Sequence, residues 1–154
     1  MLIMGVCNPT GEQDSYNGLY MTATELSEIV RDNKMRNLPV KTEHAGSEVG
    51  HVVTSFLDAS GNLNCVMQLS ASSVPASLAQ GFVCDGLALD LSLGYTVDIQ
   101  NTDSKLHARE KKIVEVSLVR KGARRGCHIT AYQEDGKNVV FRNNHDAWAA
   151  FDLS

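Results

Sequence analysis

Hydrophobic and polar residues alternate along much of this chain, and a period of two residues predicts β-strands. The clearest alternating run is Leu89–Tyr95, in which every second residue is apolar and Ser92 falls on the opposite face beside Gly94. The strand that carries Ser92 is predicted to extend over residues 87–99. Similar patterns predict strands over residues 1–7, 49–57, 63–69, 111–120, 127–133 and 139–142, with Pro39 opening another extended segment.

Short helices are predicted between these strands. A Thr-x-x-Glu capping box at residues 22–25 predicts a helix that ends at about residue 31. Its apolar stripe consists of Leu26, Ile29 and Val30. A second helix is predicted from Ser72, with proline in its first turn and Gly81 just past its end. Turn formers at residues 58–62 make a hairpin of the strands on either side, and a final helical turn or two is predicted at residues 146–152.

Six or more strands with a few short helices indicate an α+β protein with a mostly antiparallel, β-barrel-like core. At 154 residues the chain is long enough to bury a hydrophobic core, and its sequence shows no internal repeat and no change of composition that would mark a second domain. We therefore predict a single domain over residues 1–154.

Composition and charge exclude several classes of protein. The net charge of −4 disfavours nucleic acid and anionic membranes as partners, and no apolar run is long enough to span a bilayer. The four cysteines lie far apart, without metal-ligand spacing, so we expect neither a metal site nor a disulfide framework. No cofactor is predicted, and a reducing intracellular setting is the simplest interpretation.

Candidate chemistry is concentrated in four segments. Ser92 could act as a nucleophile, His44 follows the extended segment that Pro39 opens, and Glu115 is the carboxylate of the strand at 111–120. The glycine-flanked turn at residues 122–126 carries two guanidinium groups. Taken singly, each residue has an ordinary structural explanation: a solvated serine, a surface histidine, the polar face of a strand, an exposed turn. His51, His107, His128 and His145 are expected to follow that default.

Together, in this order, these segments resemble a known family. Residues 38–52, with Leu-Pro, then His44 and then Val-Gly, resemble the histidine block of the herpesvirus assemblins, the capsid maturation serine proteases. Leu91-Ser92-Leu93 resembles their nucleophile block, and Gly122-Ala-Arg-Arg-Gly126 their Gly-Arg-Arg-Arg-Gly oxyanion loop. The resemblance covers residues 38–132 and implies the assemblin fold.

The chain departs from the assemblin pattern at two positions. Glu115 stands where assemblins have a second histidine, and Ala123 replaces the first arginine of the loop. The segments around Ser92 and Glu115 instead resemble the prohead proteases of tailed phages, a related family with Ser, His and Glu. The resemblance therefore implies a Ser92-His44-Glu115 triad.

Each residue of this site has an expected role. His44 accepts the proton of Ser92 and returns it to the leaving amine, while Glu115 holds the imidazole. The Ala123 N–H and the Arg124 side chain are expected to stabilise the oxyanion, with Arg125 as a secondary candidate.

The function that the resemblance implies is a serine endopeptidase that cleaves the internal capsid scaffold protein and its own precursor during assembly. Expected partners are the scaffold protein, the capsid shell precursor and a second copy of the chain. The expected location is inside the procapsid in the infected cell: the host nucleus for a herpesvirus-like source, the bacterial cytoplasm for a phage.

Other functions remain open from the sequence alone. One is a catalytically inactive protease-like module that binds scaffold or capsid, or, less in keeping with the 6% aromatic content, an RNA-binding barrel that uses the arginines. Another is a cysteine protease with Cys127 or Cys84 as nucleophile, although neither cysteine has a recognisable nucleophile context.

Overall fold

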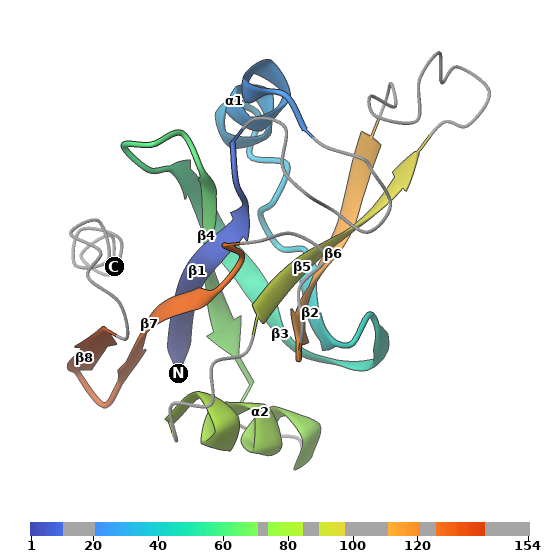
Figure 1. Ribbon diagram of the computed structural model, residues 1–154. Helices are drawn as coiled ribbons and strands as arrows, with labels where there is room; N and C mark the ends of the chain where they lie inside the picture. The colour runs from blue at the N-terminus through green and yellow to red at the C-terminus, as the bar shows by residue number, and fades with distance from the viewer. Residues whose placement is uncertain (11–20, 71–73, 85–89, 98–110, 121–125, 141–154) are drawn as a thin grey trace.

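The structure is a computed structural model that describes residues 1–10, 21–70, 74–84, 90–97, 111–120 and 126–140. Within these residues, eight strands form one sheet in the order β5-β6-β2-β3-β4-β1-β7-β8 (Figure 1). The strands are β1 (Leu2–Asn8), β2 (Pro39–Thr42), β3 (Ala45–Leu57), β4 (Leu63–Leu69), β5 (Asp90–Val97), β6 (Lys111–Val119), β7 (Ile129–Glu134) and β8 (Lys137–Val140). The helices are α1 (Ala23–Arg31) and α2 (Val74–Cys84), which lie near opposite ends of the sheet.

The sheet curls until one edge returns toward the other. β5 is an edge strand, yet Leu91 N–H donates to Cys127 O at 2.8 Å, and Asp90 forms an isolated bridge with His128, just before β7. All neighbouring strands pair in antiparallel fashion except β2 and β6, which are parallel. The predicted α+β, mostly antiparallel and barrel-like architecture is confirmed; the single domain over residues 1–154 stays a prediction.

One main core holds the sheet and both helices together. α1 contributes Leu26 and Ile29, and α2 contributes Ala76 and Val83. The predicted capping box at the start of α1 is present: Glu25 N–H donates to Thr22 Oγ1 and Thr22 N–H to Glu25 Oε1, both at 3.1 Å. These two bonds satisfy amides that have no partner inside the helix.

The predicted hairpin of β3 and β4 is confirmed, and Asp58 organises its turn. The Asp58 carboxylate accepts hydrogen bonds from the Ser60 and Asn62 amides and from the side chains of Asn62 and Asn64. On β4 the predicted inner face of Leu63, Cys65 and Met67 is buried in the main core.

Several predicted boundaries were wrong. α2 does not end at Gly81 but continues to Cys84, because Val83 beyond the glycine is buried and holds the last turn against the core. β3 begins at Ala45 and not at Val49, because a tight turn at residues 43–44 pairs its first residues with β2. The β7–β8 turn is tighter than predicted, so β8 begins at Lys137.

Other boundaries shift less or cannot be compared. β1 includes Asn8, and β7 runs from Ile129 to Glu134. β5 covers Asp90–Val97 of the predicted strand at 87–99, whose ends lie outside the described residues, as do residues 141–142 and the predicted helical turn at 146–152.

Candidate active site

The pairing of β5 with β6 places the predicted nucleophile and carboxylate on one face of the sheet. Ser92 pairs with Ser117, and Gly94 pairs with Glu115. Directly paired residues point to the same face, and residues two apart on a strand share a face. Ser92, Glu115 and Ser117 therefore project together from two neighbouring strands.

His44 reaches this face from the turn between β2 and β3. Thr42 pairs with Ala45, so Glu43 and His44 form a two-residue turn with φ values of +49° and +58°. Positive φ at both central residues is typical of type I′ hairpin turns, which strongly favour Asn and Gly. Two bulky residues in this left-handed region strain the backbone, so the surrounding contacts must hold the turn.

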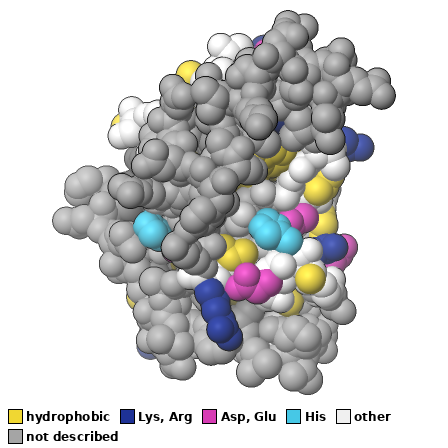
Figure 2. All heavy atoms as spheres, turned by 45° about the vertical axis from the view of Figure 1, so that its right-hand side comes forward, with side chains coloured by type: hydrophobic (Ala, Val, Ile, Leu, Met, Phe, Trp, Pro, Cys, Tyr) yellow, Lys and Arg dark blue, Asp and Glu magenta, His cyan; other side chains and the backbone are white. Residues whose placement is uncertain are grey.

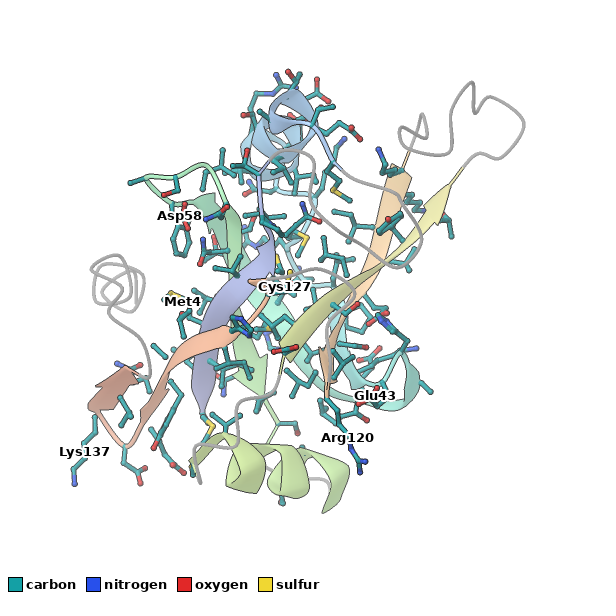
Figure 3. The ribbon with its side chains drawn as sticks, viewed as in Figure 1. Met4, Glu43, Asp58, Arg120, Cys127 and Lys137 are labelled. Carbon is teal, nitrogen blue, oxygen red and sulfur yellow. The ribbon has the colours of Figure 1, made fainter. Side chains whose placement is uncertain are left out.

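β6 supplies those contacts. Glu43 N–H donates to Leu118 O at 3.0 Å, and His44 N–H donates to Ser117 Oγ at 2.9 Å. Arg120 N–H donates to the Glu43 carboxylate at 2.8 Å, and Figure 3 shows Glu43 and Arg120 near each other where β2 and β6 end. The turn that carries His44 is therefore fixed at three points, two on β6 and one at Arg120, which directly follows that strand.

The side chains of His44, Ser92 and Glu115 make a continuous hydrogen-bonded row. His44 Nε2 lies 2.9 Å from Ser92 Oγ, and His44 Nδ1 contacts Glu115 Oε1. Because a carboxylate only accepts, Nδ1 carries the ring proton of the neutral histidine, which leaves Nε2 free to accept from the serine hydroxyl. This is the relation that a serine nucleophile and its general base require.

The His44 and Glu115 side chains of the row differ in their exposure to solvent. The His44 side chain is 43% exposed, whereas the Glu115 side chain is 9% exposed. Histidine and acidic side chains lie close together on the molecular face shown in Figure 2. The imidazole can thus meet a ligand from solvent, while its carboxylate partner is shielded from water and interacts more strongly for that reason.

Two neighbours hold the Glu115 carboxylate in place. Ser117 Oγ donates to Glu115 Oε2 at 2.6 Å, so both carboxylate oxygens are engaged. Gly94 leaves the space that the carboxylate occupies, since a Cβ built there would overlap Glu115 Oε1 and lie 2.6 Å from its Cδ. Sequence reasoning missed both roles; the available signals were the period-two spacing of Ser117 from Glu115 and a glycine inside a strand.

The predicted oxyanion residues Ala123, Arg124 and Arg125 lie outside the described residues. Both flanks of their segment are described, however. On one side Arg120 N–H bonds to Glu43, and on the other Cys127 O accepts from Leu91 N–H. Arg120 therefore lies beside the histidine turn, and Cys127 lies beside the residue that precedes Ser92.

The other described histidines and the two candidate cysteine nucleophiles do not belong to this row. His128 Nδ1 lies 2.7 Å from Asp90 Oδ1, and His51 is exposed, whereas His107 and His145 fall outside the described residues. The Cys127 thiol is buried and donates to Cys7 O at 3.6 Å, and the Cys84 thiol donates to Glu134 Oε2 at 3.3 Å. The base that a cysteine nucleophile would need, His44, faces Ser92.

The described part of the chain offers no group of three or more His, Cys, Asp or Glu side chains that could hold a metal ion. Within the same residues, neither helix has the length and apolar character needed to cross a membrane.

Comparison with known proteins supports the fold. No protein-family model matches the chain, and no curated protein matches its sequence. Among solved structures, the protease of Kaposi's sarcoma-associated herpesvirus in complex with a hexapeptide phosphonate inhibitor matches with a TM-score of 0.61 at 17% identity, over 86% of this chain and 65% of that chain. The same viral protease in complex with an allosteric inhibitor matches with a TM-score of 0.51 at 20% identity, over 84% of this chain and 76% of that chain.

These matches show that the chain has the fold of the herpesvirus assemblins, as its resemblance predicted. The chain spans slightly less than two thirds of the length of the first of these structures. At such low identity the likeness concerns the fold.

Proposed function

We propose that this chain is a serine endopeptidase of the capsid maturation type. The observation that carries the proposal is the row in which His44 bonds to Ser92 Oγ through Nε2 and to Glu115 through Nδ1. The assemblin fold supports it, because the row is built on strands of a sheet that a viral protease shares.

The proposed reaction begins with attack of Ser92 Oγ on a peptide carbonyl. His44 Nε2 takes the hydroxyl proton, and Glu115 stabilises the imidazolium and keeps the ring oriented. When the tetrahedral intermediate collapses, His44 gives the proton to the leaving amine and an acyl-Ser92 remains. Water then attacks the ester with His44 again as base, which releases the acid and restores Ser92.

Oxyanion stabilisation is assigned to residues 122–126 on the family resemblance. The proposed donors are the Ala123 N–H and the Arg124 side chain, with Arg125 as the secondary candidate. The anchoring of both flanks beside the Glu43 turn and Leu91 supports this assignment. Each well-placed oxyanion donor contributes about 3 to 4 kcal/mol of transition-state stabilisation in acyl transfer.

The proposed substrates are the capsid scaffold protein and the chain's own precursor, and the proposed partners are the capsid shell precursor and a second copy of this chain. The proposed place of action is the interior of the procapsid in the infected cell. The family resemblance is the support for these assignments.

Covalent labelling tests the proposal. The protein is incubated with a fluorophosphonate and with a peptidyl phosphonate, the inhibitor class bound by the viral protease of like fold, and the adduct is mapped by mass spectrometry. We expect one adduct on Ser92, none in Ser92→Ala, slower labelling in Glu115→Gln, and unchanged labelling in Ser55→Ala, which removes a hydroxyl from β3. No adduct on the folded wild type at any concentration would refute the protease and favour the inactive binding module.

A further inference from the structure

Ser117 is a buried polar residue of β6 that the triad does not include. It is fully shielded from solvent, and its hydroxyl makes two hydrogen bonds with residues of the candidate active site. Ser117 Oγ donates to Glu115 Oε2 at 2.6 Å and accepts from His44 N–H at 2.9 Å. A hydroxyl has only one proton to donate, so these two bonds fix its orientation.

The two bonds close a ring through His44. Starting from the His44 backbone N–H, the path runs to Ser117 Oγ, through its proton to Glu115 Oε2, across the carboxylate to Oε1, and back to His44 at Nδ1. Ser117 therefore holds the backbone of His44, Glu115 holds its imidazole, and these two side chains are hydrogen-bonded to each other. An imidazole fixed by Glu115 alone could still move as the turn moves.

Backbone strain makes this attachment important. His44 lies in a two-residue turn with positive φ at both positions, a conformation that non-glycine residues hold only where neighbouring contacts require it. Ser117 is the residue of β6 that bonds both to that turn and to the carboxylate. We infer that Ser117 is a positioning residue, which sets the His44 ring against Ser92 by fixing its backbone and its carboxylate partner together. The catalytic part of this inference rests on the proposed serine protease.

Replacing Ser117 with alanine removes a donor to the Glu115 carboxylate and leaves the His44 amide without its acceptor. Loss of a hydrogen bond to a charged group in such a site corresponds to about a tenfold to about a hundredfold loss of rate. The loss should appear in kinact, the rate constant for the chemical step of phosphonate labelling, because Ser117 is fully buried and cannot contact the bound phosphonate. KI, which reports ligand binding, should stay within about twofold of wild type.

The matched control is Thr130→Val on β7. Thr130 is also buried, and its hydroxyl donates to Met4 O at 3.3 Å, so the variant loses a buried hydroxyl bond with no triad residue involved. If Ser117→Ala fails to fold, Ser117→Cys carries the same comparison, since it keeps the side-chain volume with a much weaker hydrogen-bonding group.

The second readout is the proton NMR signal of His44 Nδ1–H, which needs no activity. A ring N–H bonded to a shielded carboxylate resonates far downfield, and the wild-type signal is assigned by its absence in His44→Gln. We expect it to broaden or move upfield in the Ser117 variant and to persist in Thr130→Val. If the wild type is not labelled, the proposed protease function is refuted. The Nδ1–H signal would still test whether Ser117 positions the His44 ring.

The two measurements together decide the inference. A selective loss of kinact with a disturbed Nδ1–H signal in the Ser117 variant supports it. An unchanged signal with labelling within about twofold of wild type overturns it, as does an equal loss in Thr130→Val.

Discussion

Gly94→Ala perturbs the candidate site through a single methyl group. Gly94 pairs with Glu115 across β5 and β6, and an added Cβ would overlap Glu115 Oε1, with Cδ at 2.6 Å and Cγ at 2.8 Å. Ordinary van der Waals contact begins near 3.4 Å, so Cδ would have to retreat by about 0.8 Å. The backbone of Gly94 is not in the left-handed region, so the conflict lies with the Glu115 side chain.

That retreat breaks the bonds on which the row depends. Both carboxylate oxygens are engaged, by His44 Nδ1 and by the Ser117 hydroxyl. Misplacing a reacting group by about 1 Å costs about a hundredfold in rate, and loss of histidine orientation in a triad costs about ten-thousandfold. We therefore expect phosphonate labelling of Ser92 to fall by at least about a hundredfold. Overpacking should also lower the free energy of unfolding by about 1 to 3 kcal/mol.

The assay combines phosphonate labelling with urea denaturation, and Gly81→Ala is the control. Gly81 lies in α2, where an added Cβ would meet nothing within 4 Å. This variant should label like wild type and gain about 0.5 to 1 kcal/mol from better helix propensity. Wild-type labelling and unchanged stability in Gly94→Ala would refute the contact between Gly94 and Glu115 as the structure draws it.

Three further predictions concern parts of the molecule away from the row. Lys111→Met should lower the free energy of unfolding by about 1 to 3 kcal/mol in urea melts. The reason is that the Lys111 side chain is 2% exposed and its Nζ bonds both oxygens of the Glu25 carboxylate. An equal loss in Lys112→Met, at the exposed neighbouring residue, would contradict this. Native protein should show one thiol that reacts rapidly with a disulfide reagent, absent in Cys84→Ala, since the other three cysteines are buried. Burial and the neighbouring Cys65 raise the pKa of the Cys7 thiol above 9.0. Beyond about pH 9 the thiol therefore loses its proton in the unfolded chain but not in the folded protein, so the free energy of unfolding should fall as the pH rises. A free energy of unfolding that does not change over this pH range would refute the shift.

The sequence predicted those elements whose signals are local. The capping box of α1 and the hairpin turn at Asp58 depend on residues a few positions apart, and both are present. The family resemblance, in the order His44, Ser92 and Glu115, also led to three side chains that do meet. Their catalytic roles stay a prediction that labelling must test.

The features that escaped prediction depend on contacts between distant segments. Glu43-His44 has no preference for a turn with positive φ, and bonds from β6 are what hold it there. The extension of α2 past Gly81 depends on burial of Val83, which no local helix signal reports. Ser117 and Gly94 acquire their roles only through strand register, and period-two spacing alone does not say which strand lies opposite.

The parallel pairing of β2 with β6 explains how β6 can bring all three residues of the row together. In that register Thr42 lies beside Leu118, so the turn that follows β2 arrives next to Ser117 and Glu115. On the other side of β6, antiparallel pairing brings Ser92 opposite Ser117. If β2 paired with β6 in the antiparallel sense about the same Val40–Val116 pair, Thr42 would lie beside Val114. The turn that carries His44 would then lie farther from Ser117 and Ser92. The orientation of a four-residue strand therefore decides whether a histidine that follows it can face the serine.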